Sequence, residues 1–234
     1  MPGRKSALIA TGTILLAVLV LLAGPLVKSG ILPWFFGLGL FAIGSLVAAI
    51  GGLICLVIVI RNRGGMLATA GMIAGLGAAV ILIRIVTGSS GVPPIHDITT
   101  DTANPPQFVS VTPALRGEGA NSIAYDPALA PQQTAAYPAI KSRLIAKPPA
   151  EVFDIVTKAI VARGWTVVGA DSATGRIEAT DTSGWWGFKD DVVVRLRPEG
   201  TGTRIDVRSV SRVGQSDLGA NAARIEKLLE SVSG

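Results

Sequence analysis

Charged residues recur at strand spacing near the end of the chain, and their types suit the recognition of anions. Asp191 and Arg195 lie four residues apart in a stretch where polar and apolar residues alternate. Arg204, Asp206 and Arg208 alternate with apolar residues in the next such stretch. Because alternate residues of a strand share a face, we expect two acids and three arginines to line one side of two adjacent strands. The planar guanidinium group of arginine can donate two parallel hydrogen bonds to one carboxylate or phosphate.

Polar residues continue this pattern into a loop and the start of a predicted helix. Two interpretations stay open. In the structural one, arginines and aspartates satisfy one another and clamp a hairpin to the last helix. In the functional one, arginines such as Arg208, Arg212 and Arg224 bind an anionic ligand or a partner. The candidate binding residues are therefore Asp191, Arg195, Asp206, Arg208, Arg212, Asp217, Asn221 and Arg224.

The single histidine, His96, stands beside two acids and suggests an alternative chemistry. His96, Asp97 and Asp101 can serve as an acid–base set for a hydrolase or transferase, or bind a divalent cation. Turn and capping hydrogen bonds are the other use of such a segment. Acid–base chemistry requires this segment to lie within hydrogen-bond reach of residues 206–224. The sequence has no zinc-type cysteine or histidine pair and no phosphate-binding glycine loop, so we expect no metal and no cofactor.

An aromatic cluster, Trp185, Trp186 and Phe188, falls between two predicted strands. Such side chains fill a core, line a ligand pocket or insert into a membrane interface. We retain all three residues as candidates for a membrane interface.

The composition indicates a chain with two different halves. Charged residues make up 16% of the chain, against about 25% in a typical soluble domain. The net charge is +5, but residues 1–91 hold six basic residues and no acidic one. The remainder holds 15 basic and 16 acidic residues. The positive charge therefore belongs to the hydrophobic half, and we expect no nucleic-acid partner.

Three apolar stretches, at about 7–27, 31–60 and 66–86, are long enough to be membrane-spanning helices. A signal peptide is the other interpretation of the first stretch, but its apolar run is long and no typical cleavage site follows. The sequence thus predicts a lipid bilayer as a partner.

The basic residues that flank these spans predict their orientation. Four lie on one side and two on the other: Arg4, Lys5, Arg61 and Arg63 against Lys28 and Arg84. We expect a multi-pass protein of the inner (plasma) membrane with a cytoplasmic N-terminus. The C-terminal domain then lies outside, in the periplasm of a Gram-negative bacterium.

We expect three regions: a membrane domain at 1–87, a proline-rich linker and extended segment at 88–137, and an α+β domain at 138–234. The sequence pattern of the last region predicts the order strand, helix, four strands, helix. Short turns favour a mainly antiparallel sheet with both helices on one face, which is a two-layer arrangement. The expected strands are 139–145, 165–169, 176–182, 190–197 and 203–211, with helices from Pro148-Pro149 to Gly164 and from Ser216 or Asp217 onward.

Three sequence blocks resemble an uncharacterised bacterial family, catalogued as domain of unknown function number 1499. The blocks are His96–Phe108, Asp190–Arg195 and Asp206–Asn221, the last followed by Arg224-Ile225. The resemblance covers about residues 95–232. It implies N-terminal membrane spans, which members often carry, and no established activity, substrate or cofactor.

These observations predict a non-enzymatic membrane-anchored protein. Its extramembrane domain is expected to bind a partner protein or an anionic envelope component. The alternative is an envelope hydrolase or transferase that uses the His96, Asp97 and Asp101 segment.

Overall fold

The computed structural model describes residues 3–61 and 65–232 and divides into two compact units. The first comprises Met1–Ser90 with Gly184–Gly187, and the second Gly91–Ser183 with Phe188–Gly234.

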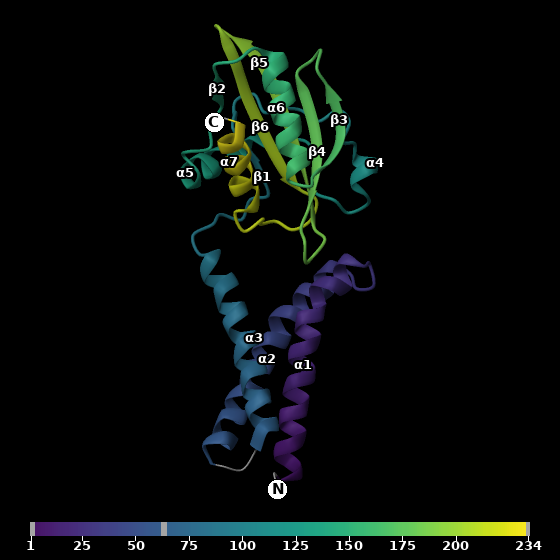
Figure 1. The fold of residues 1–234 in the computed structure, drawn as a ribbon, viewed down its shortest axis with the longest axis vertical. Coiled ribbons are helices and arrows are strands. Elements are labelled where there is room, and N and C mark those ends of the chain that lie inside the picture. Colours follow the sequence, from purple (N-terminus) through teal and green to yellow (C-terminus); the bar gives the residue numbers. More distant parts are fainter. Residues whose placement is uncertain (1–2, 62–64, 233–234) are drawn as a thin grey trace. The chain divides into compact units, whose positions relative to one another are not determined.

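The first unit contains three long helices, α1 (Arg4–Lys28), α2 (Trp34–Ile60) and α3 (Gly65–Gly88) (Figure 1). All three are long and apolar enough to cross a membrane. Their outward side chains are apolar and exposed, for example Leu15 and Ile43, as expected for a surface in contact with lipid. The expected three apolar helices are therefore present. Arg63, one of the residues used for the orientation, lies outside the described residues.

Small residues let α2 and α3 pack closely. A Cβ atom added to Gly75 would lie 2.2 Å from the main-chain oxygen of Ala48, and one added to Gly52 would lie 2.8 Å from the nitrogen of Leu76. Side chains at these positions would force the backbones apart, so glycine permits the contact.

The second unit is a six-stranded antiparallel sheet with the order β1-β6-β5-β4-β3, in which β2 also pairs with β6. The strands are β1 (Asp97–Thr99), β2 (Arg143–Ile145), β3 (Thr166–Asp171), β4 (Arg176–Thr182), β5 (Lys189–Glu199) and β6 (Gly202–Ser211). Two helices, α6 (Pro149–Ala162) and α7 (Ala220–Val232), pack on one face. The α+β class predicted from the sequence is confirmed.

The hydrophobic core lies between this face and the two helices. The alternating residues Val192, Val194 and Val207 point into it, together with Ile160 of α6 and Ile225 of α7. Asp217 caps the start of the last helix, as its sequence position predicts. Its carboxylate accepts hydrogen bonds from the main-chain nitrogens of Gly219 (2.8 Å) and Asn221 (2.8 Å).

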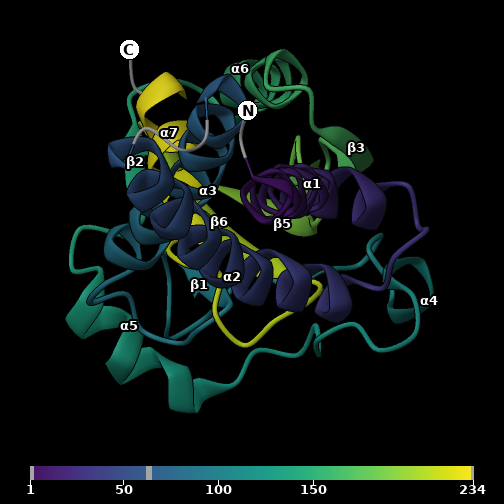
Figure 2. The same cartoon turned by 90° about the horizontal axis from the view of Figure 1, so that it is seen from below.

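The opposite face of the sheet is covered by the proline-rich segment, residues 100–137. Figure 2 shows α6 on one side of the sheet and the segment carrying α4 and α5 on the other. The segment contains three short helices: α4 (Pro113–Arg116), η1 (Pro127–Leu129) and α5 (Ala130–Ala136). A proline stands in the first turn of each, where its missing N–H group costs nothing.

The edge strand β1 also lies in the region expected to be a linker. It is only three residues long and pairs antiparallel with β6, Asp97 opposite Val210. Three residues carry too little periodicity to be recognised in a sequence. β2 is equally short, so its bounds could not be predicted accurately either. It begins at Arg143, whereas the sequence predicts a strand from residue 139.

Candidate functional site

The polar face of the sheet carries most of the candidate binding residues. The register places Arg195 opposite Asp206, and Asp191 opposite Val210. Directly opposed residues of an antiparallel pair share a face. The face therefore also includes residues of β1 and β4: Asp97, Thr99, Arg176, Glu178 and Thr180. Alternation in the sequence predicts the part of this grouping that lies on β5 and β6; the register adds the residues of β1 and β4.

Charged side chains of this face bind the irregular backbone of the covering segment. The Glu178 side chain is fully buried, and its carboxylate accepts hydrogen bonds from the main-chain nitrogens of Val109 (2.8 Å), Ser110 (2.9 Å) and Val111 (2.7 Å). Arg176 pairs with the same carboxylate at 3.2 Å. The main-chain N–H groups of this irregular segment need such partners, because no ladder of strands supplies them here.

Gln133 of α5 completes the outer edge of β1. Its side-chain oxygen accepts from the Thr99 nitrogen at 3.0 Å, and its side-chain nitrogen donates to the Thr99 oxygen at 2.7 Å. The amide thus takes the place of one residue of an additional strand.

Arg208 and Asp97 form a buried bidentate ion pair. Arg208 Nε donates to Asp97 Oδ1 at 2.9 Å, and Nη2 donates to Oδ2 at 2.7 Å. The guanidinium also donates to the main-chain oxygens of Pro106 (3.3 Å) and Ile123 (2.8 Å). Its carbon lies 5.4 Å from the ring centre of Tyr125, and equally far from that of Phe108. Arg208 is fully buried, so these contacts favour the structural interpretation of this residue.

Asp191 forms a second buried group with Arg212, Arg116 and Thr180. Arg212 Nε and Nη2 donate to the two Asp191 oxygens at 2.9 and 2.8 Å. The Thr180 hydroxyl donates to Oδ1 at 2.7 Å. Arg116 Nη1 lies 3.2 Å from Oδ2. Arg212 also donates to the main-chain oxygen of Leu115 at 3.1 Å, which links the pair to the covering segment.

The buried Asp206 collects donors at a more open end of the face. Arg195 Nε donates to Oδ2 at 3.1 Å and Arg204 Nε donates to Oδ1 at 3.1 Å. Burial by itself would raise the pKa of Asp206, but hydrogen bonds from Ser142, Arg195 and Arg204 lower this pKa below its usual value. Asp101 pairs with the same arginines. Arg195 and Arg204 are therefore each shared between Asp101 and Asp206.

Asn221, Arg224 and Asp217 lie apart from this polar face, at the start of α7. Asn221 accepts hydrogen bonds from Ser209 (2.6 Å) and Arg224 (2.6 Å), and it donates to the main-chain oxygen of His96 at 3.0 Å. Burial raises the pKa of Asp217, although the hydrogen bonds that this carboxylate accepts as a helix cap act in the opposite direction. The eight candidate binding residues thus do not form one site. Asp217, Asn221 and Arg224 lie at the start of α7, and the other five belong to the ion pairs of the polar face.

Arg224 lines an open cavity of about 450 Å³ in this second unit. The guanidinium donates to Asp181 at 2.8 Å and to Asp190 at 2.5 Å. Two further cationic residues, Arg163 and Lys227, line the same cavity, together with Trp165, Asp181, Ala220 and Ala223. Arg163 donates to the main-chain oxygens of Ala159 and Lys227.

The sequence interpretation missed Arg163 and Lys227, although one signal was present. Lys227 follows Arg224 by three residues, which places both on one face of a helix. Arg163 follows the end of α6, where no periodic signal marks its direction.

The segment with His96 does lie beside residues 206–224. The main-chain oxygen of His96 accepts from Ser211 at 2.9 Å, and Asp97 and Asp101 are bound by arginines as described. Among the residues that the structure describes, no group of three or more histidine, cysteine, aspartate or glutamate residues is arranged to hold a metal ion.

The aromatic cluster divides between the two units. Trp185 and Trp186 belong to the first, where their ring centres lie 5.9 and 5.6 Å from that of Phe41. Phe188 belongs to the second, and its main-chain nitrogen donates to the Ser183 hydroxyl at 2.9 Å. Their role at a membrane interface remains a prediction.

Replacing Arg208 by methionine is expected to destabilise the second unit by about 3–5 kcal/mol, because it leaves the Asp97 carboxylate buried without its partner. Hydrogen exchange of the β5 and β6 amides in the full-length protein measures this loss. Arg197→Met is the matched control. The Arg197 side chain is 40% exposed, and its partner Asp206 keeps the hydrogen bonds from Arg195 and Arg204, so its loss should cost at most about 1 kcal/mol.

The double variant Asp97→Asn/Arg208→Met should recover part of that loss, since it removes both buried charges. Equal exchange in Arg208→Met and Arg197→Met would contradict a structural role for the pair.

A comparison with known families identifies the greater part of the chain. The family model described as "Protein of unknown function (DUF1499)" matches residues 97–232. The matched range begins at β1 and ends with α7, so it includes the segment that covers the polar face. A comparison with curated proteins finds no match.

Proposed function

This chain belongs to the DUF1499 family, whose function is unknown, and from its geometry we propose that it is a membrane-anchored binding protein for an anionic envelope component. The proposed site is the cavity lined by Arg163, Arg224 and Lys227. We further propose that the domain carrying it faces away from the cytoplasm.

The charge of this cavity is the observation that supports the proposal. Arg163, Arg224 and Lys227 contribute three positive charges, whereas Asp181 is the one acidic residue among the lining residues. Counting Asp190, which also binds Arg224, one positive charge remains in excess. Arg163 donates to main-chain oxygens, which carry no full charge to balance it. A phosphate or carboxylate would supply the missing negative charge.

The remaining walls suit a ligand that is more than a bare ion. Trp165, Ala220 and Ala223 add apolar surface beside the cations. Ligand sites commonly combine such apolar walls with a few polar groups that orient the ligand. We therefore favour an anionic group attached to a larger molecule.

An envelope hydrolase or transferase that uses His96, Asp97 and Asp101 is the alternative. Asp97 accepts two hydrogen bonds from Arg208, and Asp101 pairs with Arg195 at 3.2 Å. Both carboxylates are therefore already engaged by arginine N–H groups, which leaves fewer of their oxygen lone pairs free to contact a substrate. These contacts give less support to catalysis than the cavity gives to binding.

Full-length protein in a neutral detergent is expected to bind inorganic pyrophosphate, measured by titration calorimetry. Lys227→Glu should weaken this binding by about tenfold or more, because it replaces an attractive charge with a repulsive one. Lys141→Glu makes the same change at an exposed position outside the cavity and should leave the affinity within about twofold.

Equal weakening by both substitutions would indicate a general charge effect and contradict the site. Failure of the unmodified protein to bind pyrophosphate would contradict the proposed function.

The proposed orientation has a separate test. Alkaline phosphatase fused after the last residue should be active, because the enzyme folds only outside the cytoplasm. The same reporter fused after Arg61, between the second and third spans, should be inactive. The reverse pattern would place the domain in the cytoplasm and contradict the positive-inside argument.

A further inference from the structure

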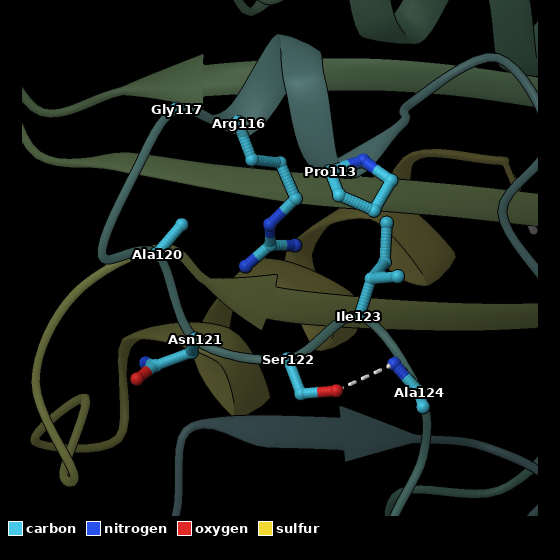
Figure 3. Close-up of a pocket in the computed structure, with 8 residues that line it drawn as sticks. All are labelled: Pro113, Arg116, Gly117, Ala120, Asn121, Ser122, Ile123 and Ala124. Carbon is cyan, nitrogen blue, oxygen red and sulfur yellow. Dashed lines mark hydrogen bonds between the residues drawn. The ribbon is translucent and has the colours of Figure 1, made fainter.

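A second cavity lies within the segment that covers the polar face, away from the residues of the Arg224 site. Its volume is about 400 Å³. The walls come from α4 and the loop that follows it: Pro113, Arg116, Gly117, Ala120, Asn121, Ser122, Ile123 and Ala124. Figure 3 shows the Arg116 side chain extending from α4 into the space enclosed by this loop, between Ile123 and Ala120.

Arg116 is buried with part of its hydrogen-bonding capacity unused. Its side chain is 1% exposed. Nη2 donates to the Ser211 oxygen at 3.2 Å. Nη1 forms an ion pair with Asp191 at 3.2 Å, but its geometry is not that of a hydrogen bond. Neither Nε nor Nη1 has a hydrogen-bond acceptor among the described residues. Unsatisfied donors on a buried charge are costly, so the arrangement suggests a missing acceptor.

The charges around Arg116 indicate that this acceptor is negative. Arg116, Arg208 and Arg212 are buried together with two carboxylates, Asp97 and Asp191. Burial lowers the pKa of Arg116, and the nearby Arg212 and Arg208 act in the same direction, whereas Asp191 and Asp97 oppose it. One positive charge in this buried group has no carboxylate of its own. An anion would balance this charge and would also accept hydrogen bonds from Nε and Nη1 of Arg116.

The rest of the cavity is suited to an apolar body. Pro113, Ala120, Ile123 and Ala124 contribute hydrocarbon surface. The Asn121 side chain donates to the main-chain oxygens of Ser211 and Gly214, so its amide nitrogen is already used. A volume of about 400 Å³ is at the lower end of the range for small-molecule sites. It suits a molecule with a few carbon atoms.

We propose that this cavity binds a small carboxylate with a short apolar chain, whose carboxylate accepts from Arg116 while the chain packs against Pro113 and Ile123. The site uses residues different from those of the Arg224 cavity. Its occupancy is therefore independent of the proposed function.

Hexanoate is a suitable probe, with hexanamide as its neutral counterpart. Full-length protein in neutral detergent is titrated with each compound, and amide exchange of residues 114–124 is followed. Hexanoate should protect this segment saturably, and hexanamide should bind at least about tenfold more weakly because it lacks the charge.

Two variants separate ligand binding from folding. Arg116→Gln removes the charge and should abolish hexanoate protection. Ala120→Phe leaves Arg116 in place but fills the cavity, and it should weaken hexanoate binding by at least about tenfold. Ala135→Phe, at an exposed position of α5, is the matched control and should bind as the unmodified protein does.

Three outcomes would overturn the proposal. The first is no protection by hexanoate up to about 10 mM. The second is equal binding of hexanamide, which would show that the protein does not recognise the negative charge of the carboxylate. The third is unchanged hexanoate binding in Ala120→Phe, which would place the ligand elsewhere.

Discussion

The extramembrane fold depends on hydrogen bonds from buried charged side chains to an irregular backbone. Residues 100–137 lie on the polar face of the sheet without a continuous strand ladder, so their buried N–H and C=O groups need other partners. Glu178 accepts from three consecutive amides, and Arg208 donates to two main-chain oxygens. Because isolated buried charges are costly, these side chains must also pair with one another. The covering segment and the ion pairs therefore require each other.

This constraint gives most of the charged residues near the C-terminus a structural role. Most of them hold the segment in place and leave little freedom for a ligand, as the bidentate pairs of Arg208 with Asp97 and of Arg212 with Asp191 show. The groups left over define the possible sites. At Arg116 these are unpaired donors beside a cavity, and at Arg224 they are the additional cations Arg163 and Lys227. Binding is inferred where charges and donors remain unbalanced.

Much of this architecture could be predicted from periodicity. Alternation in β5 and β6 predicted both the apolar core face and the shared face of Asp191, Arg195 and Asp206. Glu178 shows the same alternation with Thr180 and was equally accessible to that reasoning. Arg116 and Gln133 were not, because they lie in short helices inside an irregular segment, where spacing does not determine direction. The net charge of the chain indicates neither cavity, because each cavity has a local excess of only one positive charge.

The central claim is tested most directly at Glu178. In Glu178→Gln the side chain keeps its size but loses one acceptor oxygen and its charge. Amide exchange, measured residue by residue, should show faster exchange at Val109, Ser110 and Val111. The ladder between β5 and β6 should remain protected. Unchanged protection of the three amides would contradict the claim that buried charges hold the covering segment on the sheet.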